Sequence, residues 1–274
     1  MSEKGLPFKG FSEKEKKSIK YIISDVDDTI TKEGKLYPHV LEAIWRAKIS
    51  GRTIILVTGG SVGWADCYIR QWPIDAVIAE SGAIMLCHDK DGSILQLVNP
   101  QIDKDTVMKK RRNLLEYTSC LPFSSDQCAR FFDIAYDKKK MDSAEIKALK
   151  NTLIMYGANF TESSIHINAW FGQYNKKSAL KFFLEERLGI KEEEYLQSSI
   201  YLGDSFNDQP LFDYIPLSIG MHTVEDQREN FDVLPKYITR GTRGDGWYEV
   251  VQSLLKIRKT RKTQQKNSVK EEKK

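Results

Sequence analysis

The chain has 274 residues, of which 41% are hydrophobic and 29% are charged. This length exceeds the usual size of one domain and the apolar content suffices for a packed core, so we expect two folded domains. No segment approaches the roughly 18 to 20 consecutive apolar residues of a membrane span. The start of the chain lacks the apolar run of a secretory signal. The four cysteines show no CxxC spacing, so we expect free thiols in a cytoplasmic protein.

The net charge of +4 is distributed unevenly along the chain. Residues 256–274 contain nine Lys and Arg against two Glu, a net charge of +7, which leaves −3 for the remainder. Residues 258–274 have almost no apolar side chains, and we expect a disordered basic tail there. Such a tail can bind nucleic acid or anionic lipid. Because it lacks interleaved aromatic residues, we do not expect a nucleic-acid partner.

The first part of the chain alternates short apolar runs with amphipathic segments. Residues 1–18 are expected to be a flexible lead-in. Strands are predicted after them at 20–24, 53–57 and 76–79. Helices are predicted between these strands, at 38–49 and 62–71, because apolar residues recur there at helical spacing. This alternation is typical of a doubly wound parallel sheet in an α/β fold.

The pattern changes after the third strand. The next segment indicates a hairpin at 84–98, followed by helix, strand, helix and strand. From Lys176 onward the alternation of helix and parallel strand resumes. We therefore predict a Rossmann-like core formed by residues 1–83 and 172–257, interrupted by an inserted α+β domain at 84–171.

Polar residues follow the predicted strands at their carboxyl ends. Asp25 and Asp27 follow the first strand, Thr58 and Gly59 follow the second, and Asp204 follows a strand predicted at 199–202. Each motif alone is weak, because Asp-x-Asp and Thr-Gly are common in turns. Since the carboxyl ends of parallel strands meet at the ligand-binding edge of such a sheet, we expect these residues to lie together.

These residue types are complementary for phosphoryl transfer, which needs a nucleophile, charge neutralisation and a proton donor. A carboxylate such as Asp25 can attack phosphorus and form an aspartyl phosphate. Asp27 can protonate the leaving oxygen and then activate water. Because carboxylates repel a phosphate dianion, the site also requires cations. Mg²⁺ prefers hard oxygen ligands, and Asp25 and Asp204 provide them.

Further residues can bind the phosphate group. The hydroxyl of Thr58 and the amide of Gly59, at a turn between strand and helix, can donate to phosphate oxygens. Lys176 can add a positive charge at the same place. The sequence GDSFND at 203–208 could also form a calcium loop, but it lacks the distal Glu of an EF-hand.

The motif set resembles that of the haloacid dehalogenase superfamily of aspartyl-phosphate phosphatases. The matching motifs are DVDDT at 25–29, VTGGS with Thr58, the lysine of NKKSAL, and GDSFND at 203–208. The resemblance implies that Asp25 is the nucleophile and Asp27 the acid and base. It further implies that Asp25, Asp204 and the backbone carbonyl of Asp27 bind Mg²⁺. Asn207 and Asp208 would support the site.

The family pattern K-x-x-A-L favours Lys176 over Lys177 as the phosphate-binding lysine, because Ala179 and Leu180 complete it. Asp28 stands where many relatives have Gly, and we expect it to be a turn residue.

The insert lies between the second and third motifs, which resembles the type IIB cap of the Cof-like branch. That branch includes sugar-phosphate phosphatases and phosphomannomutases. The resemblance therefore implies a magnesium-dependent phosphatase of a small phosphomonoester, expected to be a sugar phosphate, working as a monomer or simple dimer. A phosphomutase on the same scaffold is one alternative, and a noncatalytic protein that binds nucleic acid through the basic tail is another.

Polar residues of the insert are candidates for substrate specificity, because a cap closes over the substrate. His166 and Asn168 lie on one face of a predicted strand, and Arg130 lies near another. They could contact the hydroxyl groups of a sugar. The alternative is that they satisfy the polar edge of the inserted sheet.

Overall fold

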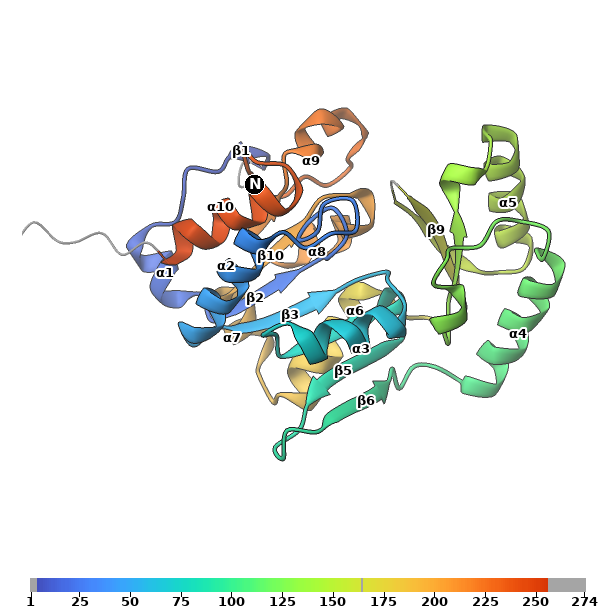
Figure 1. The fold of residues 1–274 in the computed structure, drawn as a ribbon, viewed down its shortest axis with the longest axis horizontal. Coiled ribbons are helices and arrows are strands. Elements are labelled where there is room, and N and C mark those ends of the chain that lie inside the picture. The colour runs from blue at the N-terminus through green and yellow to red at the C-terminus, as the bar shows by residue number, and fades with distance from the viewer. Residues whose placement is uncertain (1–3, 164, 256–274) are drawn as a thin grey trace, which may run out of the picture.

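The computed structural model describes residues 4–163 and 165–255. Within these residues the strands form a nine-stranded sheet and a separate three-stranded sheet. Figure 1 shows the large sheet with its flanking helices on one side of the molecule and the small sheet, with α4 and α5, on the other. The predicted α/β core with an inserted α+β unit is confirmed.

The order in which strands are added to the large sheet reverses at the first predicted strand. Its strand order is β1 (Leu6–Pro7), β12 (Tyr237–Ile238), β11 (Ser218–Gly220), β10 (Ser199–Gly203), β2 (Tyr21–Ser24), β3 (Thr53–Val57), β4 (Ala76–Ala79), β5 (Ile84–His88) and β6 (Ile94–Val98). Neighbours from β1 to β4 are parallel. From β2 the chain proceeds to β3 on one side, whereas β10 lies on the other. Such a reversal leaves a crevice at the carboxyl ends of the two central strands.

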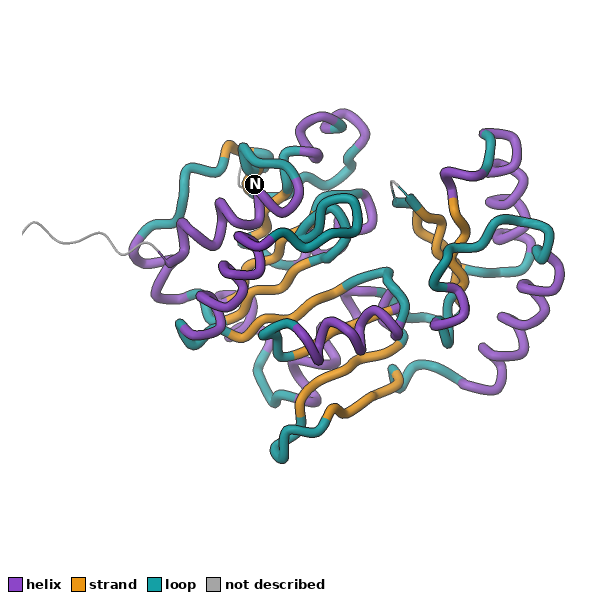
Figure 2. The backbone as a smooth tube through the Cα atoms, in the orientation of Figure 1, coloured by secondary structure: helices purple, strands orange, loops and turns teal. Residues whose placement is uncertain are grey.

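Helices cover both faces of the large sheet, as Figure 2 shows. One face packs against α2 (Pro38–Ile49), α3 (Val62–Gln71) and α10 (Arg243–Leu255). The other face packs against α6 (Lys176–Phe182), α7 (Glu192–Ser198) and α8 (Gln209–Tyr214). Adjacent residues of a strand point to opposite faces of the sheet. Ile22 packs on the face covered by α2, α3 and α10, and Ile23 packs on the face covered by α6, α7 and α8. Burial on both faces explains why these strands are continuous apolar runs.

The prediction of a flexible lead-in at 1–18 is wrong for the part that the structure describes. The short strand β1 pairs with β12, and α1 (Glu13–Ser18) follows with a capping box. Phe8 and Phe11 are buried and pack edge to face, so two aromatic side chains hold this segment on the core. The predicted basic tail at 258–274 lies outside the described residues.

The predicted hairpin at 84–98 belongs to the large sheet and not to the insert. Only residues 80–83 connect β4 to β5, and a connection this short returns the chain antiparallel beside the same strand. Gly82 is needed in this turn, because its φ is +109° and a Cβ would lie 2.6 Å from the backbone oxygen of Asn175. The expected boundary of the insert at residue 84 therefore needs correction.

Residues 99–174, which lie between β6 and the N-cap residue of α6, are called the cap segment below. Its antiparallel sheet has the order β7 (Ile134–Asp137), β9 (His166–Trp170) and β8 (Asn159–Glu162). The helices α4 (Lys104–Tyr117) and α5 (Ser143–Met155) contribute buried apolar residues to its core. The remaining helix, α9 (Thr223–Asp226), is one turn of the core after β11.

Two expectations from composition agree with the described residues. The four cysteines are free thiols, as predicted. Among the described helices, none has the length and apolar content needed to cross a bilayer.

Candidate active site

Three carboxylates meet at the carboxyl ends of the two central strands. Asp25 directly follows β2 and Asp204 directly follows β10, so the parallel pairing of these strands brings them together. One carboxylate oxygen from each of Asp25, Asp204 and Asp208 lies within 4.8 Å of the others. Burial raises the pKa of Asp25 to about 7, with Lys176 opposing and Asp208 adding to the increase. Burial also raises the pKa of Asp204.

The second acid of the first motif lies in a tight turn after β2. Val26 O accepts hydrogen bonds from the backbone N–H groups of residues 29, 30 and 31, which aims Asp27 toward the cap segment. Asp27 is accessible to water, but the surrounding protein removes part of the solvent from around its carboxyl group. This desolvation and the negative charge of Asp28 raise the pKa of Asp27. Asp28 has a φ of +55° and pairs with Arg243 at 3.0 Å, in agreement with its expected role in the turn.

Lys176 lies behind the carboxylates at the start of α6. Its ammonium group is 3.1 Å from Asp25 Oδ1 and 3.1 Å from Asp208 Oδ1, and the residue is 6% exposed. Burial opposes its charge, but Asp208 and Asp25 more than offset burial and raise its pKa above the ordinary lysine value. Lys177 instead lies over the ring of Tyr214, 4.6 Å from the centroid. The structure therefore places Lys176, and not its neighbour, in the site.

Asp208 is committed to structural hydrogen bonds. Its Oδ2 accepts from the backbone N–H groups of Asp204 at 2.9 Å and Ser205 at 3.1 Å, and its Oδ1 accepts from Tyr201 at 2.6 Å and Lys176 at 3.1 Å. Asn207 Oδ1 also accepts from Lys176, at 3.2 Å. These two residues hold the loop and the lysine.

The donor set fits a hard divalent cation. Among the described residues, Asp25 Oδ2 and Asp204 Oδ2 have no hydrogen-bond partner, whereas both oxygens of Asp208 are used. Carboxylates this close together in a buried site repel one another, and a bound cation would offset that repulsion.

The turn after β3 carries the other predicted phosphate ligands. Thr58 is 1% exposed, and its Oγ1 accepts a hydrogen bond from Gly60 N at 2.9 Å. Because the hydroxyl oxygen serves as acceptor in this bond, its hydrogen remains as a donor for a ligand.

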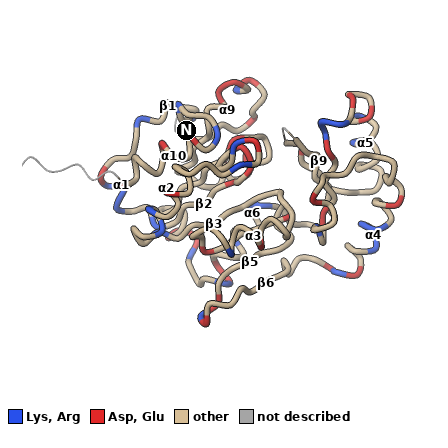
Figure 3. The backbone as a smooth tube through the Cα atoms, in the orientation of Figure 1, with Lys and Arg blue, Asp and Glu red and all other residues tan. Residues whose placement is uncertain are grey.

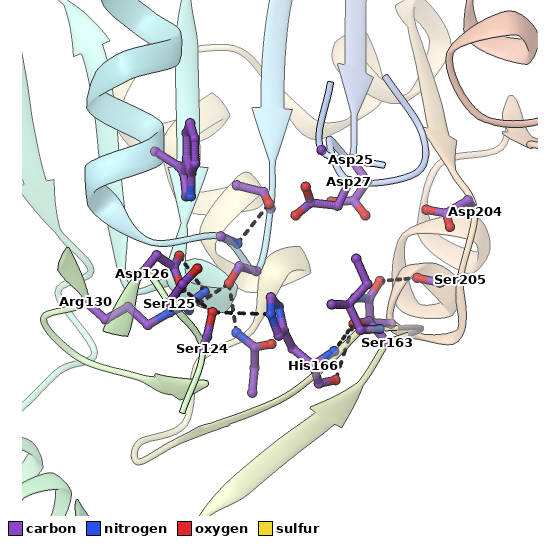
Figure 4. A pocket seen from close by; sticks show the side chains of 18 of the residues that line it. Asp25, Asp27, Ser124, Ser125, Asp126, Arg130, Ser163, His166, Asp204 and Ser205 are labelled. Carbon is purple, nitrogen blue, oxygen red and sulfur yellow. Dashed lines mark hydrogen bonds and ion pairs between the residues drawn. The ribbon is translucent and has the colours of Figure 1, made fainter. Parts of the chain in front are cut away.

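A cavity of about 200 Å³ lies between the core and the cap segment, next to Asp25, Asp27, Thr58 and Asp204. Figure 4 shows Asp25, Asp27 and Asp204 on the core side, facing polar residues of the cap segment. Of the predicted site residues, Asp25, Asp27, Thr58, Gly59, Arg130, His166, Asn168, Asp204 and Asn207 line the cavity. Sequence reasoning missed the cap residues Ser124, Ser125, Asp126 and Ser163.

The cap side of the cavity carries a carboxylate and a neutral imidazole. Burial opposes ionisation of Asp126, but Arg130 and Ser124 lower its pKa to about 2. Burial and the charge of Arg130 lower the pKa of His166, so the ring is neutral near pH 7. Ser124 Oγ lies 2.5 Å from Asp126 Oδ1 and 3.2 Å from His166 Nε2. This wall can exchange hydrogen bonds with hydroxyl groups, and the charge of Asp126 is paired with the guanidinium of Arg130 at 3.0 Å.

Glu80 is a functional candidate that sequence reasoning did not single out. It directly follows β4, the same position that Asp25, Thr58 and Asp204 occupy after their strands. This strand-end position is the signal that could have identified it. Its buried carboxylate accepts from Phe131 N at 2.9 Å and Phe132 N at 2.7 Å, and also from Asp133 N and Val62 N. Glu80 thus joins the core to the loop before β7.

Burial and the nearby Asp133 raise the pKa of Glu80 from 4.5 to about 7, although its backbone donors favour the charged form. The folded state therefore binds a proton that the unfolded state has released, and this contribution to stability is lost as the pH rises from 4.5 to 7. Between pH 5 and pH 8 the wild type should lose up to about 3 kcal/mol more free energy of unfolding than Glu80→Gln. Urea unfolding at both pH values measures this difference. Parallel pH profiles of the two proteins would contradict it.

Comparison with protein families gives one match, and the matched residues include Asp25, Thr58 and Asp204. A sequence model of the haloacid dehalogenase-like hydrolases matches residues 22–127 and 108–233, which together exceed half of the chain. A comparison with curated proteins gives no match.

Solved structures share the fold of most of this chain at low sequence identity. A Thermoplasma acidophilum protein matches over 86% of this chain and 98% of its own, with 19% identity and a TM-score of 0.66. A haloacid dehalogenase-like hydrolase from B. subtilis matches over 86% and 100%, with 16% identity and a TM-score of 0.62. A trehalose-6-phosphate phosphatase related protein matches over 85% and 95%, with 16% identity and a TM-score of 0.59. At these identities the likeness shows the fold alone.

Proposed function

The chain belongs to the haloacid dehalogenase-like hydrolase family, and from that premise we propose that it is a magnesium-dependent phosphatase. The proposed substrate is a phosphomonoester whose organic group is small, uncharged and rich in hydroxyl groups, such as a sugar phosphate. Membership makes it an enzyme of the hydrolase class. The observation that carries the finer proposal is the convergence of Asp25, Asp27, Thr58 and Asp204 on one cavity, with the Lys176 ammonium group against Asp25. A structural neighbour described as a trehalose-6-phosphate phosphatase related protein supports the same reaction class.

In the first step, an oxygen of Asp25 attacks the phosphorus atom and the bond to the substrate's ester oxygen breaks. The raised pKa of Asp27 favours its protonated form, and it gives its proton to the departing oxygen. The products of this step are the free alcohol and a phosphorylated Asp25. Thr58 donates its hydroxyl hydrogen to the phosphate group, and Lys176 offsets negative charge beside the nucleophile.

In the second step, the Asp27 carboxylate takes a proton from water, and the resulting hydroxide attacks phosphorus. The bond between phosphorus and Asp25 breaks, which releases inorganic phosphate and restores both carboxyl groups. Asp27 is accessible to water, and this access favours hydrolysis over a mutase reaction that must exclude water.

Asp25, Asp204 and the backbone carbonyl of Asp27 are the proposed ligands of Mg²⁺. When bound, the ion would neutralise charge on the phosphate oxygens and reduce the repulsion between phosphate and carboxylates. Asp208 takes no part in this set, because hydrogen bonds occupy both of its oxygens.

The substrate class follows from the cap side of the cavity. A volume of about 200 Å³ lies below the range of roughly 300 to 1,000 Å³ typical of drug-sized ligands and suits a small organic group, and a second cavity of about 640 Å³ adjoins it at Ser163, Asp204 and Asn207. The guanidinium of Arg130 is paired with Asp126 and Asp133, so it does not offer its charge to a second anionic group, and neutral His166 together with nearby serine hydroxyls suits an alcohol. Sugar phosphates meet these conditions, whereas phosphoglycerates and nucleotides add charge or size.

A panel of phosphomonoesters tests the proposal. With Mg²⁺, purified protein should release phosphate from monosaccharide phosphates faster than from phosphoglycerate derivatives or nucleotides, and EDTA should abolish the reaction. Formation of an isomeric sugar phosphate without free phosphate would favour the mutase alternative. Absence of turnover on every ester, with or without Mg²⁺, would overturn the proposal.

Substitution of the two adjacent lysines tests the positive charge beside the nucleophile. Lys176→Ala should raise KM for phosphomonoesters by about tenfold or more, because the charge that offsets Asp25 beside the phosphate group is lost. Lys177→Ala is the matched control and should leave KM within about threefold, since its side chain lies over Tyr214. Steady-state kinetics on one sugar phosphate measures both. A larger effect at Lys177 would contradict the assignment.

The same proposal places the enzyme in the cytoplasm as a monomer or simple dimer, with residues 99–174 as a cap over the cavity. Free thiols suit a reducing compartment. Figure 3 shows basic and acidic residues interspersed along the described chain, which does not favour a nucleic-acid surface there. Light scattering measures the oligomeric state.

A further inference from the structure

Two buried side chains of the cap segment donate to one backbone carbonyl of the core. Arg130 Nη1 lies 2.9 Å from Gly59 O, and Asn168 Nδ2 lies 2.8 Å from the same oxygen. Arg130 precedes β7 and Asn168 lies on β9, and they are 4% and 6% exposed. Both lone pairs of this carbonyl are therefore used by the cap segment.

Asp133 orients both donors. It is fully buried, accepts from Arg130 Nη1 at 2.8 Å and accepts from Asn168 Nδ2 at 3.0 Å. The Asn168 amide nitrogen thus donates its two hydrogens to Gly59 and Asp133, and neither hydrogen remains for a substrate. Asp126 balances the guanidinium of Arg130 from the other side, at 3.0 Å. This arrangement does not suit the sugar-binding role that the sequence suggests for Arg130 and Asn168.

The shared carbonyl belongs to the turn that carries the Thr58 hydroxyl. Gly59 O and Gly60 N belong to one planar peptide group, so fixing the carbonyl also fixes the direction of the N–H. Gly60 N donates to Thr58 Oγ1 at 2.9 Å, and this bond orients the Thr58 hydroxyl. Neither glycine has a Cβ to restrict rotation of the peptide plane, so the constraint must come from outside the turn.

We propose that Arg130 and Asn168 are positioning residues that hold the Gly59–Gly60 peptide and thereby prepare Thr58 to bind phosphate. The inference rests on the proposed function and deepens it, because docking of the cap segment then completes the phosphate site itself. Glu80 helps from the core: its backbone N donates to Gly60 O at 3.0 Å, while its carboxylate holds the loop after Arg130. Affinity for phosphate therefore depends on cap residues that do not touch it.

Asn168→Ala tests the proposal, with Asn159→Ala as matched control. Asn159 lies on the adjacent strand β8 and donates to Gly172 O at 2.7 Å in an exposed position, so its loss removes one side-chain bond of the cap segment away from the turn. The probe is inorganic phosphate with Mg²⁺, titrated by calorimetry. Asn168→Ala should weaken phosphate binding by about tenfold and raise KM for different phosphomonoesters by the same factor, with kcat changed less. Asn159→Ala should match the wild type.

Other outcomes would overturn the inference. Unchanged phosphate affinity with a raised KM for one sugar phosphate would mean that Asn168 contacts the organic group. Equal losses in both variants would indicate general weakening of the cap segment. If Asn168→Ala does not fold, Asn168→Ser is measured instead, with the same expectation. Calorimetry needs no turnover, so failure of the phosphatase proposal remains distinguishable from failure of this one.

Discussion

Asp25→Asn is expected to reduce kcat by on the order of 10⁴-fold or more, as removal of the nucleophile does in other enzymes that form covalent intermediates. An amide does not attack phosphorus, and it also replaces the anionic oxygen proposed to bind Mg²⁺. The neighbouring carboxylates of the described chain do not replace Asp25: Asp208 is held by four hydrogen bonds, Asp204 is a proposed ligand of Mg²⁺, and Asp27 points toward the cap segment.

The measurement is phosphate release from the best sugar phosphate of the panel, with Mg²⁺ at saturation. Rapid quenching of the wild type with labelled substrate should trap a phosphorylated protein, and the label should map to Asp25. Asp213→Asn is the matched control, since its carboxylate is 66% exposed and pairs with Lys4 at the surface. It should keep activity within about threefold of the wild type, because an exposed ion pair contributes little. Wild-type turnover by Asp25→Asn would overturn the nucleophile assignment.

Asp27→Asn should lower kcat on a sugar phosphate by about 10² to 10⁴, the usual range for loss of general acid and base catalysis. The size of the loss should depend on the leaving group. A sugar alkoxide needs the proton of Asp27 to depart, whereas p-nitrophenolate leaves without one. The first step should therefore survive with p-nitrophenyl phosphate, while attack by water stays slow.

Stopped-flow measurement with p-nitrophenyl phosphate tests this reasoning. Asp27→Asn should release about one equivalent of nitrophenol in a burst and then turn over slowly, because phosphorylated Asp25 accumulates. The wild type, measured in parallel, should show a smaller burst. Equal losses with both substrates, and no burst in the variant, would assign Asp27 a role other than proton transfer.

Much of the core was predictable because its signals are local. Buried parallel strands read as continuous apolar runs, and ligand-binding residues follow such strands at one edge of the sheet. The strand pattern alone therefore sufficed to place Asp25, Thr58 and Asp204 together. The family match confirms the enzyme class that these motifs predicted. The hairpin at 84–98 was misplaced because its alternation indicates two strands but not the sheet that they join.

The sequence by itself determined the class of fold, the enzyme family and the acids proposed for catalysis, since each depends on short motifs and strand periodicity. Only the tertiary structure decided how the cap segment meets the core. Arg130 and Asn168 reach Gly59 across 71 and 109 residues of chain. Glu80 reaches Phe131 across 51. Hydrogen bonds over such separations leave no periodic pattern in the sequence, because the packing of two sheets sets their geometry.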